Sequence, residues 1–175
     1  YARIINRRHF DRLSKLLDSG ETYVGGDTDA DQCYIAPTVL RGITGDEPVM
    51  ADEIFGPILP VLKVANLDQA IRFVNQRPKL LALYVFTRDK QVAERVVERT
   101  SSGGVCINDV ISHMLPPDLP FGGVGASGMG AYHGKGTFDC FSHKKSVLDK
   151  PTFVDPALRY PPSTEEKMKW VKRLL

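Results

Sequence analysis

The fold class is decided by residues 60–108, which read PVLKVANLDQAIRFVNQRPKLLALYVFTRDKQVAERVVERTSSGGVCIN. Short apolar segments rich in valine, leucine and isoleucine alternate here with two longer segments whose apolar residues recur at helical spacing. Asn66 or Asp68 can cap the first of the two helices. We expect three strands at Pro60–Val64, Leu81–Phe86 and Val105–Asn108, and two helices near Leu67–Gln76 and Asp89–Arg99.

This β-α-β-α-β order predicts the α/β class, with a parallel sheet and right-handed crossover connections. Ligand sites in such sheets gather at the carboxyl ends of the strands. The loop that begins at Asn108, directly after the last expected strand, is therefore the place where we expect a site.

A stiff turn precedes this run, because residues 52–60 read DEIFGPILP. If Glu53 and Phe55 adopt extended geometry, strand alternation places both side chains on one side. A carboxylate accepts hydrogen bonds from ribose hydroxyls, and a flat ring can pack on a base or a nicotinamide. A solvated Glu53 beside a core Phe55 explains the same spacing, so the residues alone leave both interpretations open.

The composition excludes several classes of protein. A net charge of +2, from 23 basic and 21 acidic residues with no basic face that stands out over the chain, argues against a nucleic-acid partner. Three widely separated cysteines (Cys33, Cys106 and Cys140) argue against a disulfide framework and for a reducing, cytoplasmic location. No apolar run reaches the length of a membrane span, and residue 1 does not open a signal peptide.

Outside the central run, the pattern predicts an amphipathic helix from Ile4 to Leu17 and strands at Thr22–Val24 and Tyr34–Leu40. The outer face of the helix is basic and is interpreted as solvated charge (Arg7, Arg8, Arg12 and Lys15). Residues 138–148 have mixed strand character. The chain closes with a short amphipathic segment that contains Met168, Trp170, Val171, Leu174 and Leu175.

Three apparent motifs are better explained without chemistry. Residues 123–128 spell G-x-G-x-x-G, but Leu119-Pro120-Phe121 precedes them instead of a valine-rich strand. Cys140 and His143 have no second ligand pair, so we expect no metal site. A nucleophilic pair of Cys106 and His113 is conceivable, but a thiol inside an apolar strand favours an inert core residue.

Longer motifs in a fixed order carry a resemblance: YIAPTVL (34–40), EIFGP (53–57), LALYVF (81–86), TSSGGV (100–105) with NDV (108–110), LPFGGVG (119–125), SGMGAYHGK (127–135) and FSH (141–143). The chain resembles NAD(P)-dependent aldehyde dehydrogenases of the class 3 and fatty aldehyde branch. The resemblance implies that residues 1–135 are the C-terminal part of a parallel-sheet catalytic domain. It also implies that residues 136–150 are an oligomerisation strand, that this strand extends the partner's sheet in a homodimer, and that residues 151–175 are a tail.

The resemblance also implies site residues. Glu53 would hold the nicotinamide ribose of NAD or NADP, and Phe55 would pack against the nicotinamide. The loop after the last strand would line the tunnel for a medium-chain, long-chain or aromatic aldehyde, with Ile111, Met114, Leu115, Phe121 and His133. His133 has an equally good interpretation as a hydrogen-bonded structural histidine.

In the family, a cysteine thiolate attacks the aldehyde, the thiohemiacetal gives a hydride to NAD(P), and a glutamate activates water for hydrolysis. These residues precede the position of Tyr1, so we expect no catalytic residue and no turnover in this chain alone. The alternative is a non-catalytic truncated isoform that acts as a dimerisation or regulatory module. A self-standing nucleotide-binding domain would need NAD affinity of its own, and we expect none tighter than about millimolar.

The tail allows a further hypothesis. Trp170 among Lys167, Lys169, Lys172 and Arg173 could make a peripheral contact with an anionic membrane. A solvated surface tail explains the same residues, and no span or lipidation motif follows them.

Overall fold

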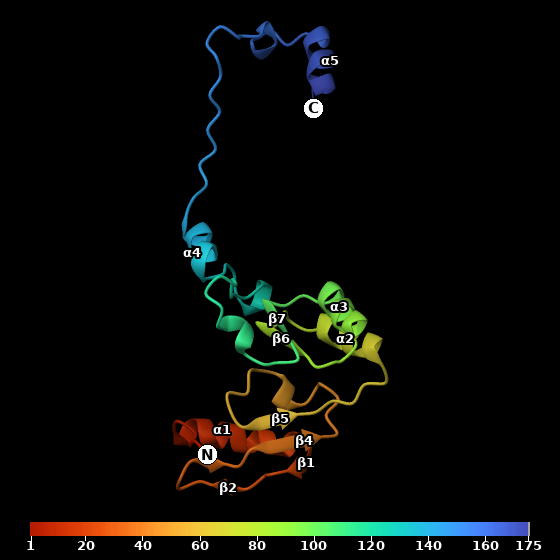
Figure 1. Cartoon of the computed structure of the whole chain (residues 1–175), viewed down its shortest axis with the longest axis vertical. Coiled ribbons are helices and arrows are strands. Elements are labelled where there is room, and N and C mark those ends of the chain that lie inside the picture. Colours follow the sequence, from red (N-terminus) through yellow and green to blue (C-terminus); the bar gives the residue numbers. More distant parts are fainter. Residues whose placement is uncertain (175) are drawn as a thin grey trace.

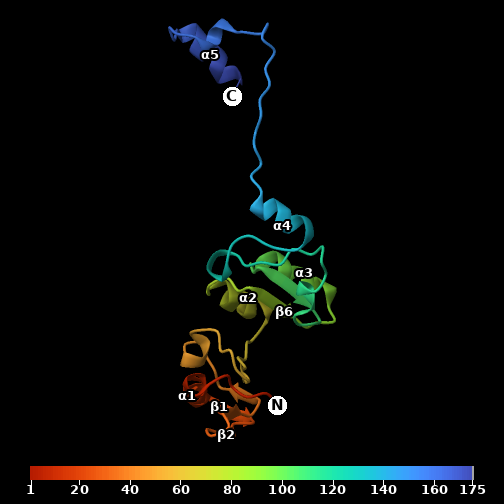
Figure 2. The same ribbon diagram turned by 90° about the vertical axis from the view of Figure 1, so that its left-hand side faces the viewer.

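The computed structural model describes residues 1–174, which form two packed units and a C-terminal extension (Figure 1). The first unit holds α1 (Arg7–Leu16) and the strands β1 to β5. The second unit holds α2 (Leu67–Asn75), β6 (Ala82–Val85), α3 (Lys90–Arg99) and β7 (Gly104–Ile107). After α4 (Gly134–Phe141) the chain leaves both units and runs to α5 (Glu165–Leu174), as the rotated view in Figure 2 also shows.

The first helix confirms the amphipathic pattern. The side chain of Asn6 caps α1 by accepting a hydrogen bond of 3.0 Å from the backbone N–H of His9. The helix therefore begins at Arg7, three residues after the expected start at Ile4. It buries Phe10 and Leu13 against the sheet, and a 3₁₀ turn, η1 (Leu17–Ser19), ends it before Gly20.

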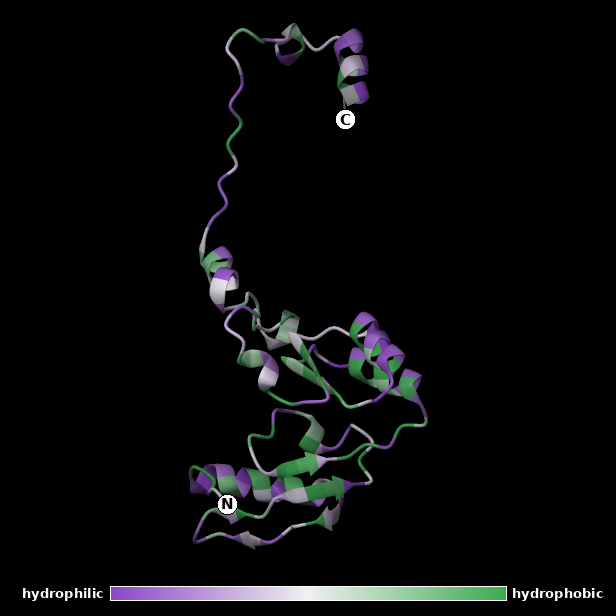
Figure 3. Ribbon diagram, viewed as in Figure 1, coloured by the Kyte–Doolittle hydropathy of each residue, from purple (hydrophilic) through white to green (hydrophobic). Residues whose placement is uncertain are grey.

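The sheet under this helix has the order β1 (Glu21–Val24), β4 (Thr38–Arg41), β5 (Ile58–Pro60). β1 pairs antiparallel with β4, and β4 pairs parallel with β5. In Figure 3 the apolar residues of β4 and β5 stand out, and α1 shows alternating apolar and polar bands. Together with the turn η2 (Pro48–Met50) they enclose the core of this unit, which is formed by Phe10, Leu13, Ile35, Leu40, Ile43, Val49 and Ile58.

The strand expected over Tyr34–Leu40 is two strands. β3 (Tyr34–Ile35) pairs antiparallel with β2 (Thr28–Asp29), and β4 begins only at Thr38. Pro37 lies between them and has no N–H to give to a ladder, which accounts for the break.

The second unit confirms both helices and both strands expected between residues 67 and 108. Asn66 caps α2 through the N–H of Gln69 at 3.0 Å, and Asp89 caps α3 through the N–H of Gln91 at 2.8 Å. β6 and β7 pair parallel, with Leu83 opposite Val105. This pairing places Asn108 directly after the carboxyl end of β7, as expected.

The first strand of the predicted β-α-β-α-β run lies in the other unit, which corrects the expectation of one continuous sheet. β5 (Ile58–Pro60) ends at Pro60, where the expected strand Pro60–Val64 begins, and it pairs with β4. The backbone N–H of Val61 still bonds to the carbonyl of Leu40, at 2.8 Å, and this bond commits the segment to the first sheet. An apolar run predicts a buried strand but does not choose its neighbour.

The expected strand at Phe138–Leu148 is wrong for its first part, because residues 138–141 are the end of helix α4. Lys135 and Asp139 form an ion pair of 2.6 Å one helical turn apart, and the Thr137 hydroxyl accepts from the N–H of His133 at 2.8 Å. Residues 143–150 have no assigned helix or strand. The domain boundaries at 135 and 150 stay predictions.

The amphipathic end of the chain forms α5, with Met168, Trp170 and Val171 inside it, whereas Leu175 lies outside the described residues. Within residues 1–174, no helix is both long enough and apolar enough to cross a membrane.

Candidate functional site

Two residues of helix α1 contact the turn that carries Glu53 and Phe55. The Arg12 guanidinium donates a hydrogen bond of 2.6 Å to the carbonyl oxygen of Ile54. The Ile54 side chain packs against the core of the first unit. Gly56 lies directly on Leu13, since a Cβ at position 56 would be 2.7 Å from the Leu13 Cδ1 atom. The turn therefore has little freedom of position.

Phe55 adopts a backbone conformation that aromatic residues rarely adopt. Its φ is +48°, and 74% of its surface is exposed. The extended geometry expected over residues 53–55 is therefore wrong at Phe55, and so is the alternative of a core phenylalanine. Strained backbone conformations cluster at active sites and ligand-binding turns, so the conformation of Phe55 motivates a functional hypothesis.

Glu53 is exposed, and its carboxylate has no hydrogen-bond partner within residues 1–174. The Phe55 ring borders an open hollow of about 400 Å³ that is also lined by Arg3, Ile4, Ile5 and His9. A free carboxylate can accept from vicinal hydroxyls, and an exposed ring can cover a flat heterocycle. These two side chains fit the nicotinamide riboside end of a dinucleotide.

The second predicted group of residues follows β7, in a turn that also stores backbone strain. Asn108 has a φ of +57° and Ile111 one of +66°. The Asn108 side chain accepts a hydrogen bond of 2.8 Å from the backbone N–H of Thr87. The backbone N–H of Asn108 donates a hydrogen bond of 2.7 Å to the carbonyl oxygen of Val85. A β-branched residue at positive φ needs such support from its surroundings.

Asp109 stabilises the same turn. Its carboxylate accepts from the Ser112 hydroxyl and, at 2.8 Å, from the N–H of Val110. These bonds favour the charged form, so the Ser112 hydroxyl first and the Val110 N–H second hold the pKa of Asp109 below its usual value. The turn is thus built as a rigid support for the residues that follow it.

Three of the five predicted tunnel residues are free for contact. Ile111 is 55%, Met114 36% and Leu115 73% exposed. Ile111 precedes, Met114 ends and Leu115 follows the short 3₁₀ turn η3 (Ser112–Met114). All three lie in the segment that follows the carboxyl end of β7, where the sequence pattern predicts a site.

The other two predicted tunnel residues are engaged within the fold. The half-buried Phe121 ring lies 5.4 Å from the His113 ring and 5.7 Å from that of Tyr132. The His133 Nδ1 atom lies 3.0 Å from the carbonyl oxygen of Leu119. His133 therefore has the hydrogen bond of a structural histidine, and its contact with an aldehyde stays a prediction.

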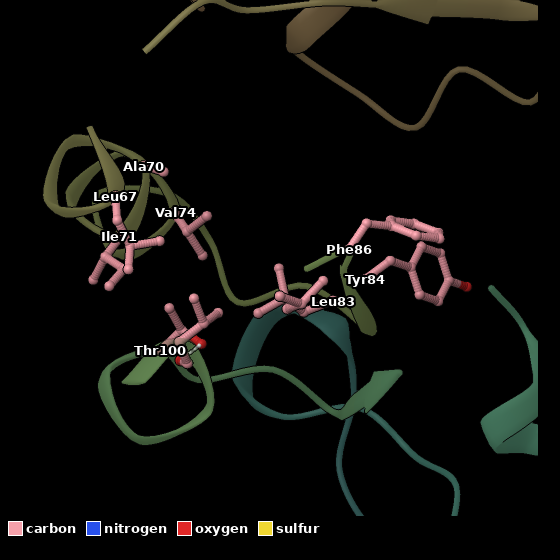
Figure 4. Close-up of a pocket in the computed structure, with 10 residues that line it drawn as sticks. Leu67, Ala70, Ile71, Val74, Leu83, Tyr84, Phe86 and Thr100 are labelled. Carbon is pink, nitrogen blue, oxygen red and sulfur yellow. Dashed lines mark hydrogen bonds between the residues drawn. The ribbon is translucent and has the colours of Figure 1, made fainter. Parts of the chain in front are cut away.

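The predicted cofactor residues lie in the first unit and the predicted tunnel residues in the second. No hydrogen bond or ring contact joins the two groups within the described chain. A half-open apolar pocket of about 270 Å³ lies elsewhere, between α2, α3 and β6 (Figure 4). It is lined by residues such as Ile71, Val74 and Leu83 and contains none of the predicted site residues, so it belongs to the packing of the second unit.

The cysteines give no sign of a nucleophile. Both ring nitrogens of His113 are buried without a hydrogen-bond partner in the described chain, so His113 does not activate the Cys106 thiol. In residues 1–174, no three His, Cys, Asp or Glu side chains come together as metal ligands would.

Sequence reasoning missed two residues that support the site. Arg12 was expected to be a solvated charge on the outer face of its helix, but it is half-buried and bonded to Ile54. From the sequence, His113 has only the interpretation of a partner of Cys106. Neither role has a local sequence signal, because each depends on a residue more than eight positions away along the chain.

Comparison with known proteins identifies the family of this chain. The sequence model described as "Aldehyde dehydrogenase family" matches residues 2–147 of the chain. The chain belongs to the aldehyde dehydrogenase family.

Known aldehyde dehydrogenases match at high identity. Aldehyde dehydrogenase family 3 member A2 of Mus musculus is 52% identical over 177 residues, which cover 100% of this chain and 37% of that protein. The dimeric NADP-preferring aldehyde dehydrogenase of Rattus norvegicus is 52% identical over 165 residues, which cover 93% of this chain and 36% of that protein. These matches support the class 3 branch.

The solved structure of the substrate-bound state of Staphylococcus aureus AldH superposes with a TM-score of 0.80 at 48% identity, over 99% of this chain and 38% of that one. The fold is thus that of an aldehyde dehydrogenase. The chain spans little more than a third of the length of the relatives that it matches.

Proposed function

We propose that this chain supplies the nicotinamide and aldehyde end of an NAD(P)-dependent aldehyde dehydrogenase that oxidises medium-chain, long-chain or aromatic aldehydes to carboxylic acids. The nucleophilic cysteine and the general base would come from chain outside these 175 residues. The observation that carries the proposal is the exposed Phe55 ring, held at a φ of +48° beside a Glu53 carboxylate that has no partner in the described chain.

Each residue has a defined part in this function. Glu53 would accept hydrogen bonds from the ribose hydroxyls, and Phe55 would limit the tilt of the nicotinamide ring. When bound, NAD or NADP supplies the acceptor for the hydride that leaves the substrate carbon. Ile111, Met114 and Leu115 would surround the apolar part of the aldehyde and exclude water from it.

The open sheet of the second unit supports a longer functional protein. β6 and β7 form a two-stranded parallel sheet, and parallel sheets are normally covered on both faces. Apolar side chains on and next to these strands are exposed: Leu81 43%, Tyr84 39%, Phe86 66% and Ile107 47%. Additional strands and helices of a complete dehydrogenase would bury this surface.

Peptide mapping of the native protein in its source tissue tests the proposal at the level of the whole molecule. A species larger than 19.4 kDa that contains these residues and a preceding cysteine supports it. In that species, Glu53→Gln and Phe55→Ala should each weaken NADH binding, measured by cofactor fluorescence. Unchanged binding in both variants would refute the assignment of the cofactor residues.

A second candidate function is a non-catalytic dimerisation or regulatory module. It is favoured by residues 143–150, which lack a strand partner in the described chain and expose Val147 (78%) and Leu148 (92%). Such a segment can add to the sheet edge of a second subunit, which also makes a homodimer part of our proposal. Mixing this chain with the full-length enzyme tests it, and an absence of both heterodimers and activity changes removes it.

We further propose a cytoplasmic location with a peripheral membrane contact through α5. Three free cysteines support a reducing compartment. Met168 (48%) and Trp170 (59%) are exposed on a helix that carries four basic residues. Deletion of residues 165–175 should reduce co-sedimentation with anionic vesicles, and unchanged co-sedimentation removes the membrane contact.

A further inference from the structure

His113 occupies the middle of η3, with its imidazole ring turned toward the sheet. The ring lies 6.0 Å from that of Tyr84 on β6 and 5.4 Å from that of Phe121. The side chain therefore contacts a strand and the glycine-rich loop at once, while its neighbours Met114 and Leu115 face outward.

The ring rests on Gly104, the first residue of β7. A Cβ at position 104 would lie 2.7 Å from the His113 Cδ2 atom and 3.1 Å from Nε2. The φ of Gly104 lies outside the left-handed region, so any residue could adopt this backbone. The space needed by the imidazole is thus the structural reason for glycine here.

Packing, and not hydrogen bonding, holds the His113 ring. Both its nitrogens are buried and have no partner within residues 1–174. A buried polar atom without a partner lowers stability, so the ring does not strengthen the turn through its nitrogens. What it provides is a flat spacer that sets the distance between η3 and β7.

This distance matters because η3 carries the exposed apolar residues. Ile111 enters the turn at a φ of +66°, a conformation that a β-branched residue keeps only under tight constraint. The hydrogen bonds of Asn108 and Asp109 fix the start of the turn, and His113 fixes its middle. A shift of the His113 ring would move Ile111, Met114 and Leu115 together.

We propose that His113, seated on Gly104, is a positioning residue that determines which apolar aldehydes the tunnel accepts. The proposal rests on the proposed function and adds to it a residue that touches neither the aldehyde nor the cofactor. It predicts that changes on either side of the contact alter aldehyde selection in a coupled manner, while cofactor binding in the other unit is kept.

The test is a double-mutant cycle in the complete dehydrogenase that contains this chain. The variants are Gly104→Ala, which inserts a methyl group under the ring, His113→Ala, which removes the ring, and the double variant. The readouts are the ratio of kcat/KM for decanal to that for propanal, and the NADH dissociation constant. His143→Ala, an exposed histidine after α4, is the matched control.

Each single variant should change the decanal-to-propanal ratio by about tenfold, with NADH affinity unchanged. The double variant should return toward the wild-type ratio, because the added methyl group occupies space that the ring has left. Unchanged ratios, additive effects without rescue, or loss of NADH binding in the single variants overturn the proposal, since they indicate no role or a general folding role.

Failure of the proposed function can be distinguished from failure of the role that we propose for His113. In that case the wild-type protein neither binds NADH nor oxidises either aldehyde. The packing can then be tested in this chain by NMR, where a nuclear Overhauser contact between the Gly104 Hα and the His113 ring is expected in the wild type. Absence of this contact also overturns the proposal.

Discussion

The Arg12 guanidinium on helix α1 lies 2.6 Å from the carbonyl oxygen of Ile54, forty-two residues further along the chain. Ile54 separates Glu53 from Phe55, so this bond ties the first helix to the backbone of the proposed cofactor turn. Leu13, the next residue of the helix, supports the turn at Gly56. Helix α1 therefore supports the turn through one hydrogen bond and one packing contact.

Arg12→Ala should lower the free energy of unfolding by about 2 kcal/mol, because a partly buried carbonyl loses a charged donor. Amide hydrogen exchange in residues 52–57 should accelerate more than exchange in β6 and β7. Arg8→Ala is the matched control, since Arg8 is exposed on the same helix and should change stability by less than about 0.5 kcal/mol. Equal effects of the two substitutions would contradict the support that we assign to Arg12.

Glu47 should make stability depend on pH in the acid range. Its carboxylate accepts from the N–H of Thr44 at 2.9 Å, the N–H of Gly45 at 2.8 Å and the Thr44 hydroxyl at 2.7 Å. These bonds lower the pKa of Glu47 from 4.5 to about 2, with the Thr44 N–H as the largest cause. The charged form is thus favoured in the folded state.

A folded-state pKa below the unfolded value stabilises the protein at pH values above the unfolded pKa, and this stabilisation is lost as pH falls through the folded pKa. For Glu47 the loss should run from about pH 4.5 down to about pH 2. Glu47→Gln should therefore unfold at lower urea than the wild type at pH 7. The gap between them should narrow across this range, and a gap that is constant with pH would show that Glu47 is not the responsible group.

Arg77 joins the two units. Its Nη2 atom donates to the carbonyl oxygen of Gly45 at 2.9 Å, and its guanidinium lies 3.5 Å from the centre of the Phe73 ring. Arg77→Ala should lower the free energy of unfolding by about 2 kcal/mol and allow the units to unfold more independently, seen as separate urea transitions by NMR. The control is Arg72→Ala, on the exposed face of α2. A single transition in both variants would contradict a joining role.

The parts of the fold that depend on nearby residues could be predicted from the sequence. Asn66 and Asp89 each cap a helix from three or fewer positions away, and the apolar periodicity after them is continuous. The partner of β5 could not be predicted, since Ile58 pairs with Thr38 across twenty residues and any buried strand would satisfy the same pattern. The mixed strand character that begins at Phe138 predicts a strand, whereas the ion pair of Lys135 and Asp139 favours the helix that the structure has there.

The candidate site also has features that depend on nearby residues and features that depend on distant ones. The types and spacing of Glu53 and Phe55 allow a cofactor turn and the family resemblance implies one, but the backbone at Phe55 is supported by Arg12 and Leu13. Because this support comes from another element, the local sequence does not reveal it. The residues around Phe55 alone suggest an extended conformation, whereas the φ of Phe55 is positive. Likewise, the need for glycine at position 104 could not be predicted from the sequence, because it comes from the His113 ring that packs against this residue in the fold.

Phe55 provides the clearest test of strain kept for function. An aromatic residue at a φ of +48° costs about 1 kcal/mol or more, whereas asparagine adopts this region readily. Because 74% of Phe55 is exposed, its replacement removes little buried apolar area. Phe55→Asn should therefore raise the free energy of unfolding by about 0.5–1 kcal/mol, measured by urea denaturation.

The same substitution should weaken NADH binding in the complete enzyme, since it removes the flat ring that we propose covers the nicotinamide. Phe86→Asn is the matched control, because Phe86 is 66% exposed but has no positive φ, so its replacement should not raise stability. Higher stability together with weaker binding is expected only if the protein keeps a strained residue for its ligand. Lower stability in Phe55→Asn would mean that the ring makes stabilising contacts, and the argument from strain would then fail.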